Sequence, residues 1–146
     1  MRLTMSSECA IHGLLYLAIF GEGRPVLLPD LARRLGVSAH TLRKVFQSLT
    51  MAGLLVTFRG VKGGYALARA PAEITLKHVV DAIESGCPTN HCLLRRGECE
   101  LGCDCAVGSV LARVADATND ALRGITLREL MESVEDREKQ LTWVKV

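Results

Sequence analysis

Five of the six cysteines of this chain lie between residues 87 and 105, and they constrain its fold more than any other feature. The residues between them are rich in Gly and charged side chains and lack the apolar periodicity of a buried helix or strand. Hydrophobic packing therefore does not order this segment, which leaves disulfide bonds, zinc or an iron–sulfur cluster. The five are Cys87, Cys92, Cys99, Cys103 and Cys105.

The rest of the composition predicts a reducing compartment. The chain has 146 residues, 49% hydrophobic and 23% charged, as is typical of one globular domain. No apolar run reaches the roughly 18 residues that a membrane span needs. The apolar residues 10–20 lie next to Glu8, include His12 and lack a small-residue cleavage site, which argues against a signal peptide. We therefore expect a cytoplasmic protein without a membrane partner, in which clustered cysteines bind metal or respond to redox state.

Charge is distributed unevenly along the chain. Residues 31–72 carry seven basic and no acidic side chains, whereas residues 73–146 carry nine basic and thirteen acidic ones. The net charge of +2 therefore hides a balance of +7 over residues 31–72 and of −4 over residues 73–146. A solvated basic face or a phosphate-binding footprint would both give this pattern. The seven basic residues are Arg33, Arg34, Arg43, Lys44, Arg59, Lys62 and Arg69.

The first expected helix runs from Ser6 or Ser7, either of which is a suitable N-cap, to Phe20. Glu8 lies in its first turn, where a carboxylate suits the helix dipole. Glu8 and His12 are four residues apart and therefore share a face. Taken alone, they are a capping carboxylate and an ordinary surface histidine.

Residues 27–53 have the pattern of a helix-turn-helix. Pro29 opens a short helix, Gly36 ends it, and Ser38 caps a second helix whose residues Leu42 and Phe46 belong to a buried stripe. The opposite face of the second helix is polar and basic, as in a helix that enters the major groove of DNA. The candidate DNA-binding residues here are Ser38, His40, Thr41, Arg43, Lys44 and Gln47.

A β-hairpin with a Gly-rich tip is expected directly after this helix. Two β-prone runs flank residues 59–64, which read Arg-Gly-Val-Lys-Gly-Gly. A hairpin in this position is a wing, and its glycines let backbone amides approach phosphates. Arg59 and Lys62 are the candidate DNA-binding residues of the wing. The loop lacks the spacing of a nucleotide-binding P-loop.

A helix over residues 75–85 precedes the cysteines, and a long helix is expected to follow them with Asp104 as its N-cap. The apolar stripe of the long helix has no obvious partner in its own domain, so the same helix of a second subunit is the simplest one. Packing on its own domain is the alternative. Residues 126–129, Thr-Leu-Arg-Glu, form a capping box that opens a last helix.

The spacing Cys92-x6-Cys99-x5-Cys105 favours an iron–sulfur cluster, because structural zinc sites are usually built from closely paired cysteines. Cys99-x3-Cys103 would suit such a pair, so zinc stays an alternative. Cys103 and Cys105 point to opposite sides of an extended segment, and we favour Cys105 because the positive end of the long helix offsets the charge of a ligated cluster. Three thiolates leave one coordination position open or weakly filled, which suits a sensor.

Several of these motifs together resemble the Rrf-two (Rrf2) family of transcription regulators. They are residues 1–4 (Met-Arg-Leu-Thr), the helix-turn-helix, residues 52–55 (Ala-Gly-Leu-Leu), residues 59–68 and the cysteine loop. The resemblance covers nearly the whole chain and extends to iron–sulfur cluster regulators, nitric-oxide-sensitive repressors and rhizobial iron regulators. It implies Cys92, Cys99 and Cys105 as cluster ligands, Glu8 as an acidic fourth ligand from the other protomer, and His12 as an occasional ligand. Cys9, Cys87 and Cys103 depart from the family pattern.

We therefore expect a mainly α fold with a small β-hairpin wing, that is, a winged helix-turn-helix with a long dimerisation helix. The expected parts are residues 1–85 for DNA binding, 86–105 for the cluster, 106–124 for dimerisation and 125–146 for a last helix and tail. The expected function is a homodimeric, non-enzymatic regulator of palindromic double-stranded DNA, controlled by a 2Fe-2S or 4Fe-4S cluster that senses nitric oxide, oxygen, iron or redox state. The alternatives are a zinc- or thiol-based regulator without a cluster and an iron–sulfur electron-transfer protein.

Overall fold

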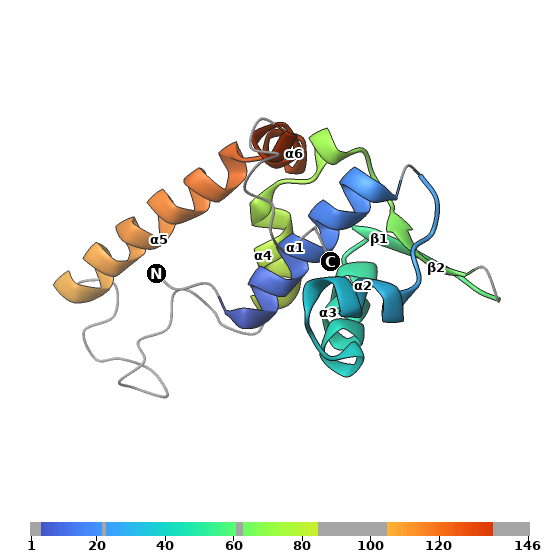
Figure 1. Ribbon diagram of the computed structural model, residues 1–146. Helices are drawn as coiled ribbons and strands as arrows, with labels where there is room; N and C mark the ends of the chain where they lie inside the picture. Colours follow the sequence, from blue (N-terminus) through green and yellow to red (C-terminus); the bar gives the residue numbers. More distant parts are fainter. Residues whose placement is uncertain (1–3, 22, 61–62, 85–104, 136–146) are drawn as a thin grey trace.

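The computed structural model describes residues 4–21, 23–60, 63–84 and 105–135 (Figure 1). Within them the chain is mainly helical, with one antiparallel hairpin, which confirms the expected fold class. The elements are α1 Met5–Phe20, α2 Leu28–Leu35, α3 Ala39–Met51, β1 Leu55–Phe58, β2 Gly64–Leu67, the 3₁₀ turn η1 Pro71–Glu73, α4 Leu76–Glu84, α5 Ala106–Gly124 and α6 Leu127–Glu135. None of these helices is long and apolar enough to cross a membrane.

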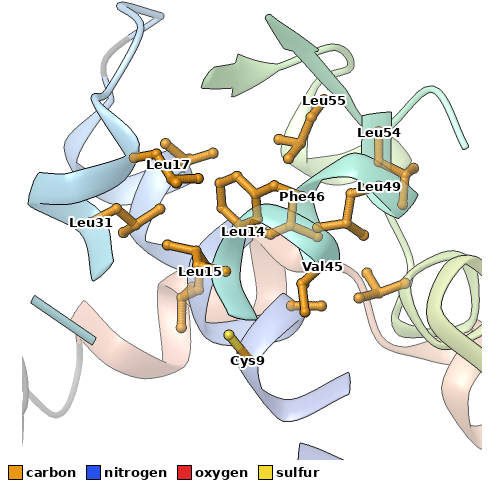
Figure 2. Packing of buried hydrophobic residues seen from close by; sticks show 14 of the residues in the cluster. Cys9, Leu14, Leu15, Leu17, Leu31, Val45, Phe46, Leu49, Leu54 and Leu55 are labelled. Atoms are coloured by element: carbon orange, nitrogen blue, oxygen red, sulfur yellow. The ribbon is translucent and has the colours of Figure 1, made fainter. Parts of the chain in front are cut away.

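One hydrophobic core joins α1 to α2, α3, α4 and α6 (Figure 2). Leu14 of α1, Leu31 of α2 and Phe46 of α3 are among its most buried side chains. Leu127, the first residue of α6, is only 1% exposed and belongs to the same core. The chain therefore returns after α5 to pack against the helices formed by its first half.

Two helix starts differ from the sequence predictions. The N-cap of α1 is Thr4, not Ser6 or Ser7, because the Thr4 hydroxyl accepts a hydrogen bond from the Ser7 N–H at 3.2 Å. The N-cap of α5 is Cys105, not Asp104, and its sulfur accepts a hydrogen bond from the Gly108 N–H at 3.4 Å.

The other helix boundaries follow the expected signals. Gly36 ends α2 in the left-handed conformation at φ 65°. Ser38 caps α3 by accepting a hydrogen bond from the Thr41 N–H at 3.0 Å. Thr126 and Glu129 form the predicted capping box, with two reciprocal hydrogen bonds of 3.2 Å.

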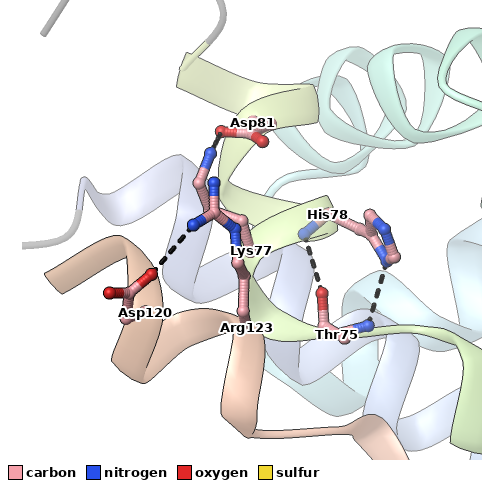
Figure 3. Close-up of polar contacts among 6 residues, drawn as sticks. All are labelled: Thr75, Lys77, His78, Asp81, Asp120 and Arg123. Carbon is pink, nitrogen blue, oxygen red and sulfur yellow. Dashed lines mark hydrogen bonds and ion pairs between the residues drawn. The ribbon is translucent and has the colours of Figure 1, made fainter. Parts of the chain in front are cut away.

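Helix α4 is tied at its start to the junction between α5 and α6. The Leu76 N–H donates to the Ile125 carbonyl at 2.9 Å, and the Leu127 N–H donates to the Ile74 carbonyl at 2.8 Å. Figure 3 shows the hydrogen bonds by which Thr75 and His78 cap α4. The start of α4 and the end of α5 are therefore held together by the backbone.

Helix α5 extends away from the remaining helices in Figure 1 and has no buried residue. Its apolar stripe is open to solvent over its first half. The exposed fractions are 68% for Val107, 54% for Val110, 62% for Leu111 and 56% for Val114. The stripe thus does not pack on the helices that the structure describes.

Candidate nucleic-acid interface and cysteine site

Helix α3 separates an apolar face from a polar one. Leu42, Val45, Phe46 and Leu49 are at most 5% exposed and fill the core, as their spacing predicted. The face turned to solvent carries four side chains that can contact DNA. They are His40, Arg43, Lys44 and Gln47.

Ser38 and Thr41 have a local role at the start of α3. Their hydroxyl oxygens lie 2.8 Å apart, and Ser38 also accepts from the Thr41 N–H. Ser38 is exposed and Thr41 is half-buried. The two residues therefore hold the first turn of α3, which is the end of a recognition helix that reaches base edges.

The wing follows α3 as expected. Leu55 pairs with Leu67 and Phe58 with Gly64 in an antiparallel register. Gly64 has φ 146°, and a Cβ there would lie 2.3 Å from the Val26 carbonyl oxygen, so a side chain would push the hairpin off the preceding strand-like segment. Arg59 is exposed directly after β1, and Lys62 lies outside the described residues.

An aromatic contact joins the recognition helix to the wing. The rings of Phe46 on α3 and Tyr65 on β2 meet edge to face with centroids 5.0 Å apart. Val26 pairs with Tyr65 through two backbone hydrogen bonds of 2.9 Å, which fixes the strand that carries this ring. The ring contact and these bonds thus link α3 to the described part of the wing.

Cys105 is the one expected cluster ligand of the cysteine segment within the described residues. Its half-buried sulfur lies at the N-terminus of a 19-residue helix and accepts the Gly108 N–H. This end of the helix carries a partial positive charge. Cys87, Cys92, Cys99 and Cys103 lie outside the described residues.

The first turns of α1 carry two expected ligands and one cysteine. Glu8 and His12 are both exposed, as expected of residues that share a face. Cys9 is only 7% exposed and packs in the hydrophobic core, and burial raises the pKa of its thiol above the usual 9.0. Cys9 is therefore a core residue in this fold.

The described residues do not by themselves assemble a metal site. Among residues 4–21, 23–60, 63–84 and 105–135, no group of three or more His, Cys, Asp or Glu side chains is arranged to hold a metal ion. Two of the three cysteines predicted as cluster ligands, Cys92 and Cys99, lie outside these ranges.

A polar cluster that the sequence did not predict lies between α1 and α4. The Ser7 hydroxyl, which is fully buried, donates to Glu84 Oε1 at 2.7 Å. The same oxygen accepts from the Thr4 N–H at 3.3 Å and lies 3.2 Å from the Thr4 hydroxyl. The bond from Ser7 lowers the pKa of the Glu84 carboxyl below 4.5; desolvation opposes this effect, and the Thr4 bonds add to it. One signal of this cluster is present in the sequence: Glu84 lies near the end of the helix expected over residues 75–85, where the helix dipole disfavours a carboxylate.

Comparison with known proteins agrees with this geometry. The Rrf2 family model, described as "Iron-dependent Transcriptional regulator", matches residues 3–133. The chain is 33% identical over 135 residues to the HTH-type transcriptional regulator IscR of Pectobacterium carotovorum subsp. carotovorum (strain PC1), covering 92% of this chain and 82% of that protein. It is 37% identical over 135 residues to Protein aau3 of Rhizobium meliloti (strain 1021), covering 91% of this chain and 86% of aau3.

Solved structures show the same fold. CymR (YrzC), the global cysteine regulator of B. subtilis, has a TM-score of 0.73 at 25% identity and covers 91% of this chain and 98% of its own. IscR of T. potens has a TM-score of 0.72 at 24% identity, and the match covers 97% of this chain and 93% of the IscR chain. With the exposed face of α3 and the adjoining wing, these similarities establish that the chain belongs to the Rrf2 family of winged-helix, DNA-binding transcription regulators.

Proposed function

We propose that this chain is a homodimeric regulator whose binding to a palindromic DNA operator is controlled by an iron–sulfur cluster. Cys92, Cys99 and Cys105 would hold the cluster, and Glu8 of the other protomer would complete its coordination. His12 and Cys103 are the alternative ligands. The cluster is of the 2Fe-2S or 4Fe-4S type, and the protein acts in the cytoplasm without catalysing a reaction.

The observation that carries the cluster proposal is the position of Cys105. A half-buried sulfur that accepts a backbone N–H at a helix N-terminus suits a thiolate ligand, because the helix end offsets part of the negative charge of a ligated cluster. Cys92-x6-Cys99-x5-Cys105 supplies the other two thiolates at spacings unlike those of zinc knuckles. When bound, such a cluster supplies a cross-link between distant thiolates that nitric oxide, oxygen or iron loss can break.

The exposed residues of α3 and of the wing support the DNA-binding half of the proposal. Arg43, Lys44 and Gln47 present donors from α3 toward base edges and phosphates, while Arg59 extends the basic surface onto the wing. Phe46 and Tyr65 keep the two parts in one orientation. Residues 31–72 contain no acidic side chain. The nearest acidic residue before them is Asp30, which forms an ion pair with Arg33 at 3.6 Å.

Dimerisation accounts for the open stripe of α5. Four large apolar side chains that are more than half exposed are unfavourable in water, and a second copy of α5 would bury them. Two recognition helices would then face two operator half-sites about 34 Å apart, one turn of DNA. A change at the cysteine site shifts this spacing and therefore the affinity for the operator.

The test is the visible absorption spectrum of the protein purified without oxygen, together with its iron and sulfide content. We expect Cys92→Ala, Cys99→Ala and Cys105→Ala each to abolish the visible absorption, since two thiolates hold a cluster poorly. Cys87→Ala and Cys103→Ala are matched controls that should keep it. A colourless protein that contains zinc, or one that contains no metal, would contradict the proposal and favour the zinc or thiol alternative.

Glu8→Ala separates the fourth ligand from a capping carboxylate. A carboxylate is a hard ligand on an iron that prefers thiolates, so its loss should leave a cluster that assembles but decays faster. If Glu8 only stabilises the first turn of α1, its removal should leave the spectrum and the decay rate unaltered. Loss of the cluster in His12→Ala or Cys103→Ala would instead identify one of these residues as the fourth ligand.

A further inference from the structure

The carboxylate of Glu84 joins the last turn of α4 to the first turn of α1. Its Oε1 atom accepts the Ser7 hydroxyl at 2.7 Å and the Thr4 N–H at 3.3 Å. Ser7 is 0% exposed and is the one buried polar side chain among the described residues. The Ser7 oxygen accepts from the Thr4 hydroxyl at 3.1 Å, and Glu84 is the acceptor for the Ser7 proton, so Ser7 favours the arrangement in which Glu84 is in place.

The dipole of α1 explains why a carboxylate at this position acts between helices. Glu84 is the last residue of α4 within the described part of the chain. It faces the N-terminus of α1, where the partial charge is positive and where the Thr4 N–H donates to it. The favourable interactions of this carboxylate are therefore with α1, and they are lost if the end of α4 moves away.

The same junction borders the recognition helix. Thr4 and Glu84 line a hollow of about 520 Å³ together with Lys44, Val45 and Ser48 of α3. Val45 is a core residue on the inner face of α3, and Lys44 lies on its DNA-facing side. A displacement of α4 relative to α1 would therefore change the support beneath α3.

The junction also adjoins both sides of the proposed cluster site in the sequence. Glu84 lies two residues before residue 86, where the expected cluster segment begins, and Glu8 follows Ser7 directly. We propose that Glu84 is a positioning residue that couples the state of the cysteine segment to the orientation of α3 through its bonds to Ser7 and Thr4. This inference rests on the proposed cluster-controlled DNA binding and assigns to α4 the transmission between the two sites.

The test compares the ratio of two dissociation constants across variants. Fluorescence anisotropy measures the binding of a DNA duplex, selected by the wild-type protein from a random-sequence pool, by the cluster-loaded full chain and by the same chain after anaerobic chelation of iron. We expect the ratio of the two dissociation constants to change about fivefold toward one in Glu84→Ala. A change of this size is within the usual range of allosteric coupling. Glu84→Gln keeps an oxygen acceptor for Ser7 and Thr4 and should recover most of the ratio.

Two further variants show whether the effect is specific. Ser7→Ala should move the ratio in the same direction as Glu84→Ala but less far, because the contacts of Thr4 with Glu84 remain. The double variant should match Glu84→Ala, because Glu84 takes part in all of these contacts. Asp81→Ala is the matched control: it removes another carboxylate of α4, which pairs with Lys77 of the same helix and not with α1. Asp81→Ala should keep the wild-type ratio. Visible absorption and melting temperature establish that each variant is loaded and folded.

The outcomes separate the two proposals. Suppose that the wild-type ratio is well away from one and that the ratio of Glu84→Ala is within twofold of it. This result would overturn the role of Glu84 and leave cluster-controlled binding standing. A ratio altered equally by Glu84→Ala and Asp81→Ala would also overturn it. A wild-type ratio of one, with the cluster present, would overturn cluster control itself and the coupling with it.

Discussion

A charge placed in the α5 stripe should dissociate the proposed dimer. Val110 is 54% exposed, so a partner helix would bury about half of a valine side chain. A fully buried valine contributes about 1.5–3 kcal/mol, which makes the buried half worth roughly 1 kcal/mol. A twofold interface contains the residue twice, so Val110→Glu should lose about 2 kcal/mol from this term alone.

That loss corresponds to a dimer dissociation constant raised about 30-fold, since each 1.4 kcal/mol is tenfold. The effect should exceed this value because two carboxylates would be brought together in an apolar contact. Sedimentation velocity over a concentration series measures the constant. Val114→Glu should behave in the same way, and both variants should bind the operator weakly.

Ser109→Glu is the control for this experiment. It adds the same charge to the same helix, but helix periodicity turns residue 109 away from the stripe. We expect this variant to remain a dimer. If Val110→Glu and Val114→Glu dimerise as well as the wild type does, the stripe is not the interface and the assignment of α5 as the dimerisation helix is wrong.

Four further predictions follow from individual side chains. Arg59→Ala should weaken binding to all DNA sequences and reduce the salt dependence by about one unit, measured by anisotropy at several salt concentrations. Gln47→Ala should instead alter base preference, by roughly 1–3 kcal/mol for a lost bidentate contact, as seen with a set of single-base operator variants. Cys9, buried and with a raised pKa, should resist alkylation in the native protein and react only on unfolding, as followed by mass spectrometry. The pKa of Glu84 is lowered in the folded state, so this carboxylate stabilises the fold above the usual pKa of 4.5, and the effect is lost as the pH falls through the folded-state pKa. Because a glutamine does not titrate, the drop in melting temperature on acidification should be smaller in Glu84→Gln than in the wild type.

Most of the DNA-binding fold follows from local sequence signals. Gly36, Ser38 and the apolar stripe that includes Phe46 predicted a helix-turn-helix, because caps and helical periodicity are encoded within a few neighbouring residues. The hairpin at residues 55–67 was predicted from its Gly-rich tip. The same kind of signal located the capping box of α6.

Features that depend on distant contacts were missed or misplaced. Ser6 and Ser7 are good N-cap residues by composition, yet Thr4 caps α1 because Ser7 is turned inward to Glu84, 77 residues away in the sequence. The pairing of Leu76 and Leu127 with the backbone of residues 74 and 125 is equally nonlocal. No local pattern distinguishes Leu127 as a core residue from Leu130, the other leucine of α6.

The candidate site divides in the same way. The polar face of α3 and the place of Cys105 at the start of the long helix agree with what spacing predicted. The burial of Cys9 was not predictable, because a cysteine on α1 beside Glu8 has the same local sequence whether it faces the core or a ligand. The ligand roles of Cys92, Cys99 and Cys103 stay predictions, and these residues lie outside the described part of the chain.

The most direct test of cluster-controlled regulation is one DNA titration made on one preparation before and after its cluster is removed. The protein is purified without oxygen, its visible absorption is recorded, and its affinity for the selected duplex is measured in both states. We predict dissociation constants that differ at least fivefold between the two states, as for other allosteric ligands. Equal affinities in the presence and absence of a spectroscopically intact cluster would contradict the account.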